Sequence, residues 1–162
     1  MPQVGEYADI FRALGRFLDD LNAASVQIDN QGEYMAVRWN RTLGSVQERI
    51  FRERDLDALR EQARAMRRGL LKASPSRGSL AELLRTLGQE LDRDKIEVST
   101  ISQNEVGFDL TGTVDRRYVR RSYVLSELEA ISTQRMVLRG GAAPPEDTSY
   151  AARFKRLVDQ GR

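Results

Sequence analysis

Two groups of arginine residues carry the most distinctive chemistry in this sequence. The first lies in residues 60–77, a stretch with six basic residues and one acidic residue. The second lies in residues 116–121, with Tyr118 and Tyr123 beside it. A guanidinium group binds phosphate or carboxylate through paired N–H donors, so both groups are candidate polyanion contacts. The candidate arginines are Arg60, Arg64, Arg67, Arg68, Arg116, Arg117, Arg120 and Arg121.

Each group also has a purely structural interpretation. Arginines at i, i+4, i+7 and i+8 are common on a solvated helix face, and residues 60–77 lack the interleaved aromatic residues of single-strand nucleic-acid binders. Charged residues on an edge strand protect a sheet from pairing with another sheet, which is the alternative for residues 116–121. The two tyrosines of the second group resemble a base-stacking platform only loosely.

The composition limits other chemistry. The chain contains no histidine and no cysteine, so the commonest general base, the thiolate nucleophile and the commonest transition-metal ligand are all missing. The sequence has no G-x-G-x-x-G, P-loop, G-x-S-x-G or S-x-x-K pattern. We therefore expect a protein that is not an enzyme and that uses no cofactor.

Acidic residues gather at two predicted helix ends, Asp19 with Asp20, and Asp92 with Asp94 and Glu97. Carboxylate oxygens are the ligands of calcium sites, but the spacing here does not follow an EF-hand loop. We interpret these residues as part of helix-to-strand turns and expect no metal site.

Apolar periodicity predicts the elements that position these groups. Asp55, Ser79 and Ser126 are the expected N-caps of three helices, and Ser79 with Glu82 has the spacing of a capping box. The expected helices are residues 6–21, 55–68, 79–91, 126–138 and 148–160. The expected strands are residues 26–28, 33–40, 45–54, 96–101, 106–112 and 117–124.

The order of these elements is repeated along the chain. Residues 8–19 align without gaps to residues 81–92, with six identical positions that include Gly15 and Gly88. The strand-to-helix stretch at residues 46–59 has its counterpart at residues 118–131. Self-similarity of this kind indicates a duplicated unit, and chance similarity between two leucine-rich helices is the alternative.

The predicted fold class is α+β, as a single domain over residues 1–139. We expect two pseudo-twofold-related helix-strand-strand-strand-helix repeats, at about 6–69 and 79–139, that form antiparallel sheet packed with helices. A three-stranded meander cannot bury both faces alone, so the repeats form either one sheet or two sheets that share a helical layer.

Residues 140–162 are expected to be a tether followed by a C-terminal docking helix. Glycines and prolines fill the tether. The helix has an apolar stripe that we expect to dock on the repeat body or on a dimer mate, because a helix of this length is unstable alone. The stripe is Tyr150, Phe154, Leu157 and Val158.

The element order over about residues 6–138 resembles the fold shared by type III secretion chaperones and the YbjN group, in which helices pack on an antiparallel sheet. The resemblance implies a dimeric protein-binding module. We therefore expect a non-catalytic protein–protein interaction module, chaperone- or adaptor-like and homodimeric, which binds through a sheet face or edge. The alternative is a nucleic-acid-binding protein that uses the arginine-rich surfaces.

The expected location is the cytoplasm, with no membrane contact. The first residues lack a basic segment followed by an apolar run, and no stretch approaches the roughly 18 apolar residues of a membrane span.

Overall fold

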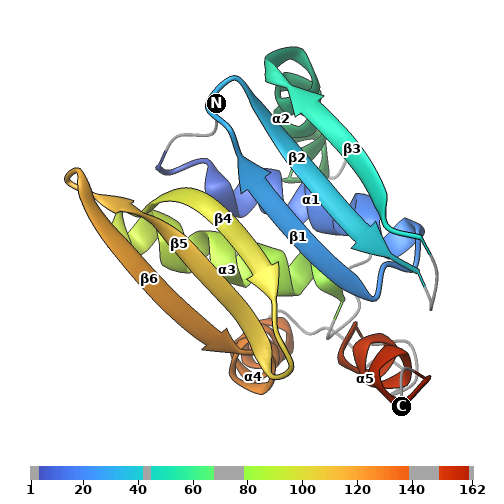
Figure 1. Cartoon of the computed structure of the whole chain (residues 1–162). Helices are drawn as coiled ribbons and strands as arrows, with labels where there is room; N and C mark the ends of the chain where they lie inside the picture. Colours follow the sequence, from blue (N-terminus) through green and yellow to red (C-terminus); the bar gives the residue numbers. More distant parts are fainter. Residues whose placement is uncertain (1–3, 42–44, 68–78, 139–149, 161–162) are drawn as a thin grey trace.

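The computed structural model describes residues 4–41, 45–67, 79–138 and 150–160 (Figure 1). The helices in this part of the chain are α1 (Tyr7–Asp20), α2 (Glu53–Arg67), α3 (Leu80–Asp94), α4 (Leu125–Leu138) and α5 (Tyr150–Gln160). The strands are β1 (Ser25–Asn30), β2 (Tyr34–Asn40), β3 (Gln47–Arg52), β4 (Glu97–Gln103), β5 (Gly107–Val114) and β6 (Arg117–Val124). The predicted tether before the C-terminal helix lies outside the described residues, as do residues 68–78 between the two predicted repeats.

The six strands form one antiparallel sheet in the order β3-β2-β1-β4-β5-β6. The prediction of α+β structure is confirmed, and of the two arrangements left open the single sheet is the one found. The central ladder joins β1 to β4, where Ile28 lies opposite Ile101. Figure 1 shows α1 and α3 side by side behind the central strands, with α2 and α4 flanking them.

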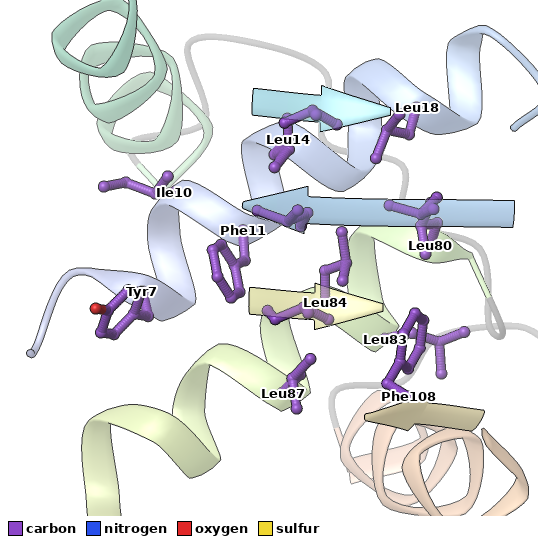
Figure 2. Packing of buried hydrophobic residues seen from close by; sticks show 14 of the residues in the cluster. Tyr7, Ile10, Phe11, Leu14, Leu18, Leu80, Leu83, Leu84, Leu87 and Phe108 are labelled. Atoms are coloured by element: carbon purple, nitrogen blue, oxygen red, sulfur yellow. The ribbon is translucent and has the colours of Figure 1, made fainter. Parts of the chain in front are cut away.

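Alternating residues of the strands and one stripe of each central helix meet in the core. Met35, Val37 and Trp39 alternate along β2 and are buried, as expected where one face of a strand points to a helical layer. Fully burying a side chain of this size stabilises the fold by about 1.5–3 kcal/mol. The helical side of the core, shown in Figure 2, includes Ile10, Phe11, Leu14, Leu18, Leu80, Leu83, Leu84 and Leu87.

Two glycines bring α1 and α3 into backbone contact. A Cβ atom added to Gly15 would lie 2.5 Å from the Cα atom of Ala81. A Cβ atom added to Gly88 would lie 2.7 Å from the backbone nitrogen of Ala8. Glycine is therefore required at both positions, although it lowers helix propensity by about 1 kcal/mol relative to alanine.

The two central helices also cap one another. Asp19 of α1 accepts hydrogen bonds from the backbone N–H groups of Leu80 and Ala81, at 3.0 and 2.9 Å. Asp92 of α3 accepts from the N–H groups of Tyr7 and Ala8, at 3.3 and 3.1 Å. These donors have no partner within their own helix, so each carboxylate satisfies groups that helix geometry leaves open.

Of the three N-caps predicted from the sequence, the structure has one and lacks two. Ser79 is the N-cap of α3, and its hydroxyl accepts from the N–H group of Glu82 at 3.3 Å, which confirms that prediction. The N-cap assignments of Asp55 and Ser126 were wrong, because α2 begins at Glu53 and α4 begins at Leu125. Each helix continues directly from a strand, so each predicted cap lies inside the first turn.

Candidate interaction surfaces

The β6 strand forms one free edge of the sheet. All eight of its residues pair with β5, from Arg117 opposite Val114 to Val124 opposite Gly107. Within the described chain no strand pairs with its other side. An edge of this kind presents unpaired N–H and C=O groups that can pair with a further strand.

The arginines of β6 point to both faces of the sheet. Arg121 lies opposite the buried Leu110 and therefore faces the helical layer, where its Nη1 atom is 2.6 Å from Oδ2 of Asp94. Arg120 points to the opposite face, with its Nη2 atom 4.0 Å from a carboxylate oxygen of Asp109. The Arg121 side chain is 46% exposed and the Arg120 side chain is 68% exposed, so both arginines are accessible to solvent.

The other positions of β6 add to this basic edge. Arg117 lies on the same face as Arg121 and is exposed, and Tyr118 on the opposite face is 70% exposed. No acidic residue occurs in the strand. The β6 edge therefore presents positively charged side chains on both of its faces.

The turn that leads into β6 holds Arg116 in a strained conformation. Asp115 and Arg116 form the two-residue connection from β5, and their φ angles are 49° and 65°. Positive φ at both central positions is the geometry of a type I′ turn, for which Asn-Gly or Asp-Gly is favoured. An L-residue other than glycine, asparagine or aspartate at the second position costs about 1–2 kcal/mol. Backbone strain of this kind is concentrated at active sites, ligand clamps and switch regions of proteins.

The other predicted basic group lies on α2, and its first member is engaged within the chain. Arg60 donates to Glu53 at 2.9 Å, to Asp57 at 2.5 Å and to Glu6 at 3.2 Å. These hydrogen bonds raise the pKa of the Arg60 guanidinium, with Glu53 as the largest cause. Three carboxylates around one guanidinium leave little positive charge for an external polyanion.

The remaining members of this group are described only in part. Arg64 forms an ion pair with Glu61, and its side chain is 52% exposed. Arg67 is the last residue of α2, and Arg68 lies outside the described residues. The structure does not bring the two predicted groups together, because α2 follows one edge strand of the sheet and β6 is the other (Figure 1).

The C-terminal helix α5 docks on the body through Tyr150. This side chain is completely buried, stacks on Phe108 with 6.3 Å between ring centroids, and donates its hydroxyl to Gln103. Burial raises the pKa of the Tyr150 phenol. The rest of the predicted stripe, Phe154, Leu157 and Val158, is half-buried.

Arg153 gives α5 a second anchor. Its Nε atom donates to the backbone oxygen of Ala23 at 3.1 Å, and its Nη2 atom donates to Asp19 at 2.6 Å. Asp19 therefore connects three helices, since the same carboxylate caps α3. The interpretation of Asp19 as a helix-to-strand turn residue is wrong, because it lies in the last turn of α1 and its carboxylate holds α3 and α5.

In the described residues, no group of three or more Asp or Glu side chains is arranged to hold a metal ion. None of the helices described is long and apolar enough to cross a lipid bilayer.

Sequence reasoning missed the reciprocal caps and the strained turn. The caps had a signal, because the aligned blocks 8–19 and 81–92 both end in aspartate and both begin where a helix starts. The turn had a weaker signal, because Asp-Arg is not a favoured turn pair and only the strand register places it there.

Comparison with known proteins gives no further guide: no family model matches the chain, and neither a curated protein nor a solved structure shows significant similarity to it.

Proposed function

We propose that the chain is a non-catalytic protein–protein interaction module, adaptor- or chaperone-like, that adds an extended acidic segment of a partner protein to the β6 edge. The observation that carries the proposal is the accessible edge strand with arginine on both of its faces. Main-chain hydrogen bonds supply affinity in this type of complex, and alternate side chains supply specificity.

The alternation of the arginines favours an extended peptide over a nucleic acid. Consecutive residues of a strand point to opposite faces, so Arg120 and Arg121 do not lie along one surface as a line of phosphates requires. A peptide strand added to the edge has the same period of two. In an antiparallel partner, the residues opposite Arg121, Arg120 and Arg117 occupy positions i, i+1 and i+4. A segment with acidic residues at these positions matches the edge.

The proposal includes a duplicated architecture with pseudo-twofold symmetry. Three pairs of like residues support it, each separated by 73 positions: Gly15 and Gly88, Asp19 and Asp92, and Ile28 and Ile101. In each pair, the first residue contacts the second half of the chain, and the second residue makes the equivalent contact with the first half. A twofold axis that passes between Ile28 and Ile101 and between α1 and α3 accounts for all three relationships.

Duplication makes β3 and β6 equivalent edges with different side chains. Ile50 of β3 pairs with Ala36, and Ser122 of β6, which is 72 positions later, pairs with Asp109. Because the two equivalent edges now carry different charges, each is suited to a different partner.

A cytoplasmic location belongs to the same proposal. A chain without cysteine needs no oxidising compartment to reach its folded state.

The alternative function is nucleic-acid binding through the basic residues of the β5–β6 turn and β6. Phosphate contacts release counterions, so such binding weakens steeply as salt rises. Peptide addition depends largely on main-chain hydrogen bonds and responds less to salt.

Fluorescence anisotropy separates the two functions. The probes are an extended peptide with glutamates at i, i+1 and i+4, a peptide of the same composition with the glutamates moved, and single-stranded and duplex oligonucleotides. We expect the first peptide to bind at least tenfold more tightly than the second. Arg120→Glu should weaken its binding at least tenfold, whereas Arg64→Glu on α2 should leave it unchanged.

Two results would overturn the proposal. The first is tight binding of an oligonucleotide without binding of the peptide, with an affinity that falls steeply between about 50 and 200 mM salt, as phosphate contacts require. This result would assign the edge to nucleic acid. Equal binding of the two peptides shows a charge attraction without strand addition.

A further inference from the structure

We propose that the β3 edge binds a second copy of this chain, so that two six-stranded sheets join edge to edge into one sheet of twelve strands. This inference concerns the edge that the proposed partner does not use. It therefore stands or falls independently of peptide binding at β6.

The β3 strand is the second free edge of the described sheet. Its six residues pair with β2, from Tyr34 opposite Arg52 to Trp39 opposite Gln47, and no described strand pairs with its other side. Phe51 lies opposite the buried Met35 and faces the core. The alternate residues therefore face away from the helices, and these are Glu48, Ile50 and Arg52.

These three residues are complementary to themselves. In an antiparallel pair of β3 strands centred on Ile50, the two isoleucines lie opposite each other. Glu48 then lies opposite Arg52 of the second copy, and the same ion pair forms again on the other side of the axis. Ile50 is 39% exposed in the single chain, so the pairing covers an apolar side chain as well as two charges. Opposite charges and apolar pairs in direct cross-strand positions each stabilise a sheet.

A row of alternating charges in the chain ends at this edge. Asp29 of β1 accepts from Arg38 of β2 at 2.9 Å, and Arg38 donates in turn to Glu48 of β3 at 2.6 Å. The row stops on Glu48, whose side chain is 44% exposed. In the proposed pair, Arg52 of the second copy continues the alternation of negative and positive charge, and its guanidinium contacts the solvent-exposed side of the Glu48 carboxylate.

The same arrangement is unfavourable at the other edge. Any antiparallel self-pairing of β6 centred near Arg120 and Arg121 places arginine opposite or diagonal to arginine, with no acidic residue in the strand to offset it. Like charges in direct cross-strand positions are destabilising. Pairing β3 with β6 of another copy would place the basic edge against Arg52 and would also propagate into an open filament. The isologous β3 pair is the arrangement that closes.

Sedimentation velocity over a range of concentrations measures the association, and two substitutions at equivalent positions identify the edge. Ile50→Lys places two ammonium groups at the centre of the pair, and we expect it to weaken dimerisation at least tenfold. Ser122→Lys makes the same kind of change at the corresponding position of β6 and should leave the dimer intact. A wild-type chain that stays monomeric at all concentrations overturns the proposal.

A charge exchange tests the register. Glu48→Arg places arginine opposite arginine at both ends of the pair, and it should weaken the dimer. The double substitution Glu48→Arg with Arg52→Glu restores two opposite-charge pairs with their order reversed, and it should recover most of the association. Melting temperatures of the monomeric variants control for the loss of the Arg38 ion pair. Failure of the double variant to recover association contradicts a register centred on Ile50.

Cysteine cross-linking reports the pairing directly, because the natural chain has no cysteine. Residues opposite each other in an antiparallel pair have Cα atoms about 4.5–5.5 Å apart, within the range of a disulfide. Ile50→Cys should therefore form a disulfide-linked dimer under mild oxidation, and Ser122→Cys should not. Cross-linking of Ser122→Cys but not of Ile50→Cys assigns self-association to β6 and overturns the proposal.

Discussion

Asp19 and Asp92 each cap the helix that carries the other. Asp19 of α1 accepts from the first N–H groups of α3, and Asp92 of α3 accepts from the first N–H groups of α1. Each helix therefore depends on its neighbour for the acceptors of its first two N–H groups. The two halves of the chain therefore stabilise each other through backbone groups as well as through the apolar core.

Removing either cap should destabilise the protein. Loss of a helix cap costs about 0.5–2 kcal/mol, and we expect Asp92→Ala to fall in that range. Asp19→Ala should cost more, because it also removes the ion pair with Arg153. Urea unfolding measures both free energies. Glu105→Ala, in the exposed β4–β5 connection, is the control and should leave the midpoint unchanged.

Alanine at Gly15 or Gly88 should destabilise the chain even though alanine favours helix. The added Cβ atom would lie 2.5 to 2.7 Å from backbone atoms of the facing helix, and backbone cannot move aside as a side chain end can. Overpacking of this kind costs about 1–3 kcal/mol. Thermal unfolding of Gly15→Ala and Gly88→Ala, compared with Lys155→Ala on the exposed side of α5, measures the effect. Equal melting temperatures for all three variants would contradict the close contact.

Arg116→Gly should stabilise the fold while removing one positive charge beside the edge that the proposed partner binds. Glycine adopts positive φ without the cost of about 1–2 kcal/mol that falls on an arginine. Asp115 followed by glycine is also a favoured type I′ pair. Arg117→Gly is a control for stability alone, because glycine in an extended strand is destabilising by about 0.5–1 kcal/mol and Arg117 itself belongs to the proposed binding edge. Calorimetry gives the stability of each variant, and peptide anisotropy gives its affinity.

Stability should fall at alkaline pH because of two buried tyrosines and one half-buried tyrosine. Burial raises the pKa of Tyr7, Tyr123 and Tyr150 in the folded chain, while unfolded tyrosine titrates near about 10. The neutral phenol is thus favoured by folding, so this contribution is fully present below about pH 10 and is lost as pH rises above it. Melting temperatures between about pH 8 and pH 12 should show the decline. Tyr150→Phe should make it shallower.

Local patterns were sufficient to predict the elements of this fold. The apolar stripe of the first helix predicted its buried face: Ile10, Phe11, Leu14 and Leu18 are buried, and the other two members, Phe17 and Leu21, are half-buried. The Ser79 cap was predictable from the local sequence because its hydroxyl accepts a hydrogen bond from the first turn of the helix that it precedes. The cap predicted at Asp55 was wrong, because β3 continues without a turn into α2. Asp55 instead accepts from the N–H group of Arg52, which precedes the helix.

Features that depend on distant residues were not predicted. The residues next to Asp19 in the sequence do not indicate that its carboxylate caps Leu80 and Ala81, more than 60 residues away, and only the comparison of the two aligned blocks carried a signal. The separation of the two arginine groups also follows from the strand order, which places β3 and β6 at opposite ends. The engagement of Arg60 by three carboxylates needs the fold, because one of them is Glu6.

Joining two chains at β3 determines where their β6 strands lie. The pair leaves one basic edge at each end of the twelve-stranded sheet, about 50 Å apart at the usual spacing of neighbouring strands. The dimer is then bivalent, with two identical acceptor edges facing outward on a rigid spacer. A partner with two acidic segments joined by a linker that spans this distance gains avidity, since the second contact becomes intramolecular. A single chain of the same sequence would have no such advantage, so the proposed self-association at β3 would raise the effective affinity of the proposed partner for β6.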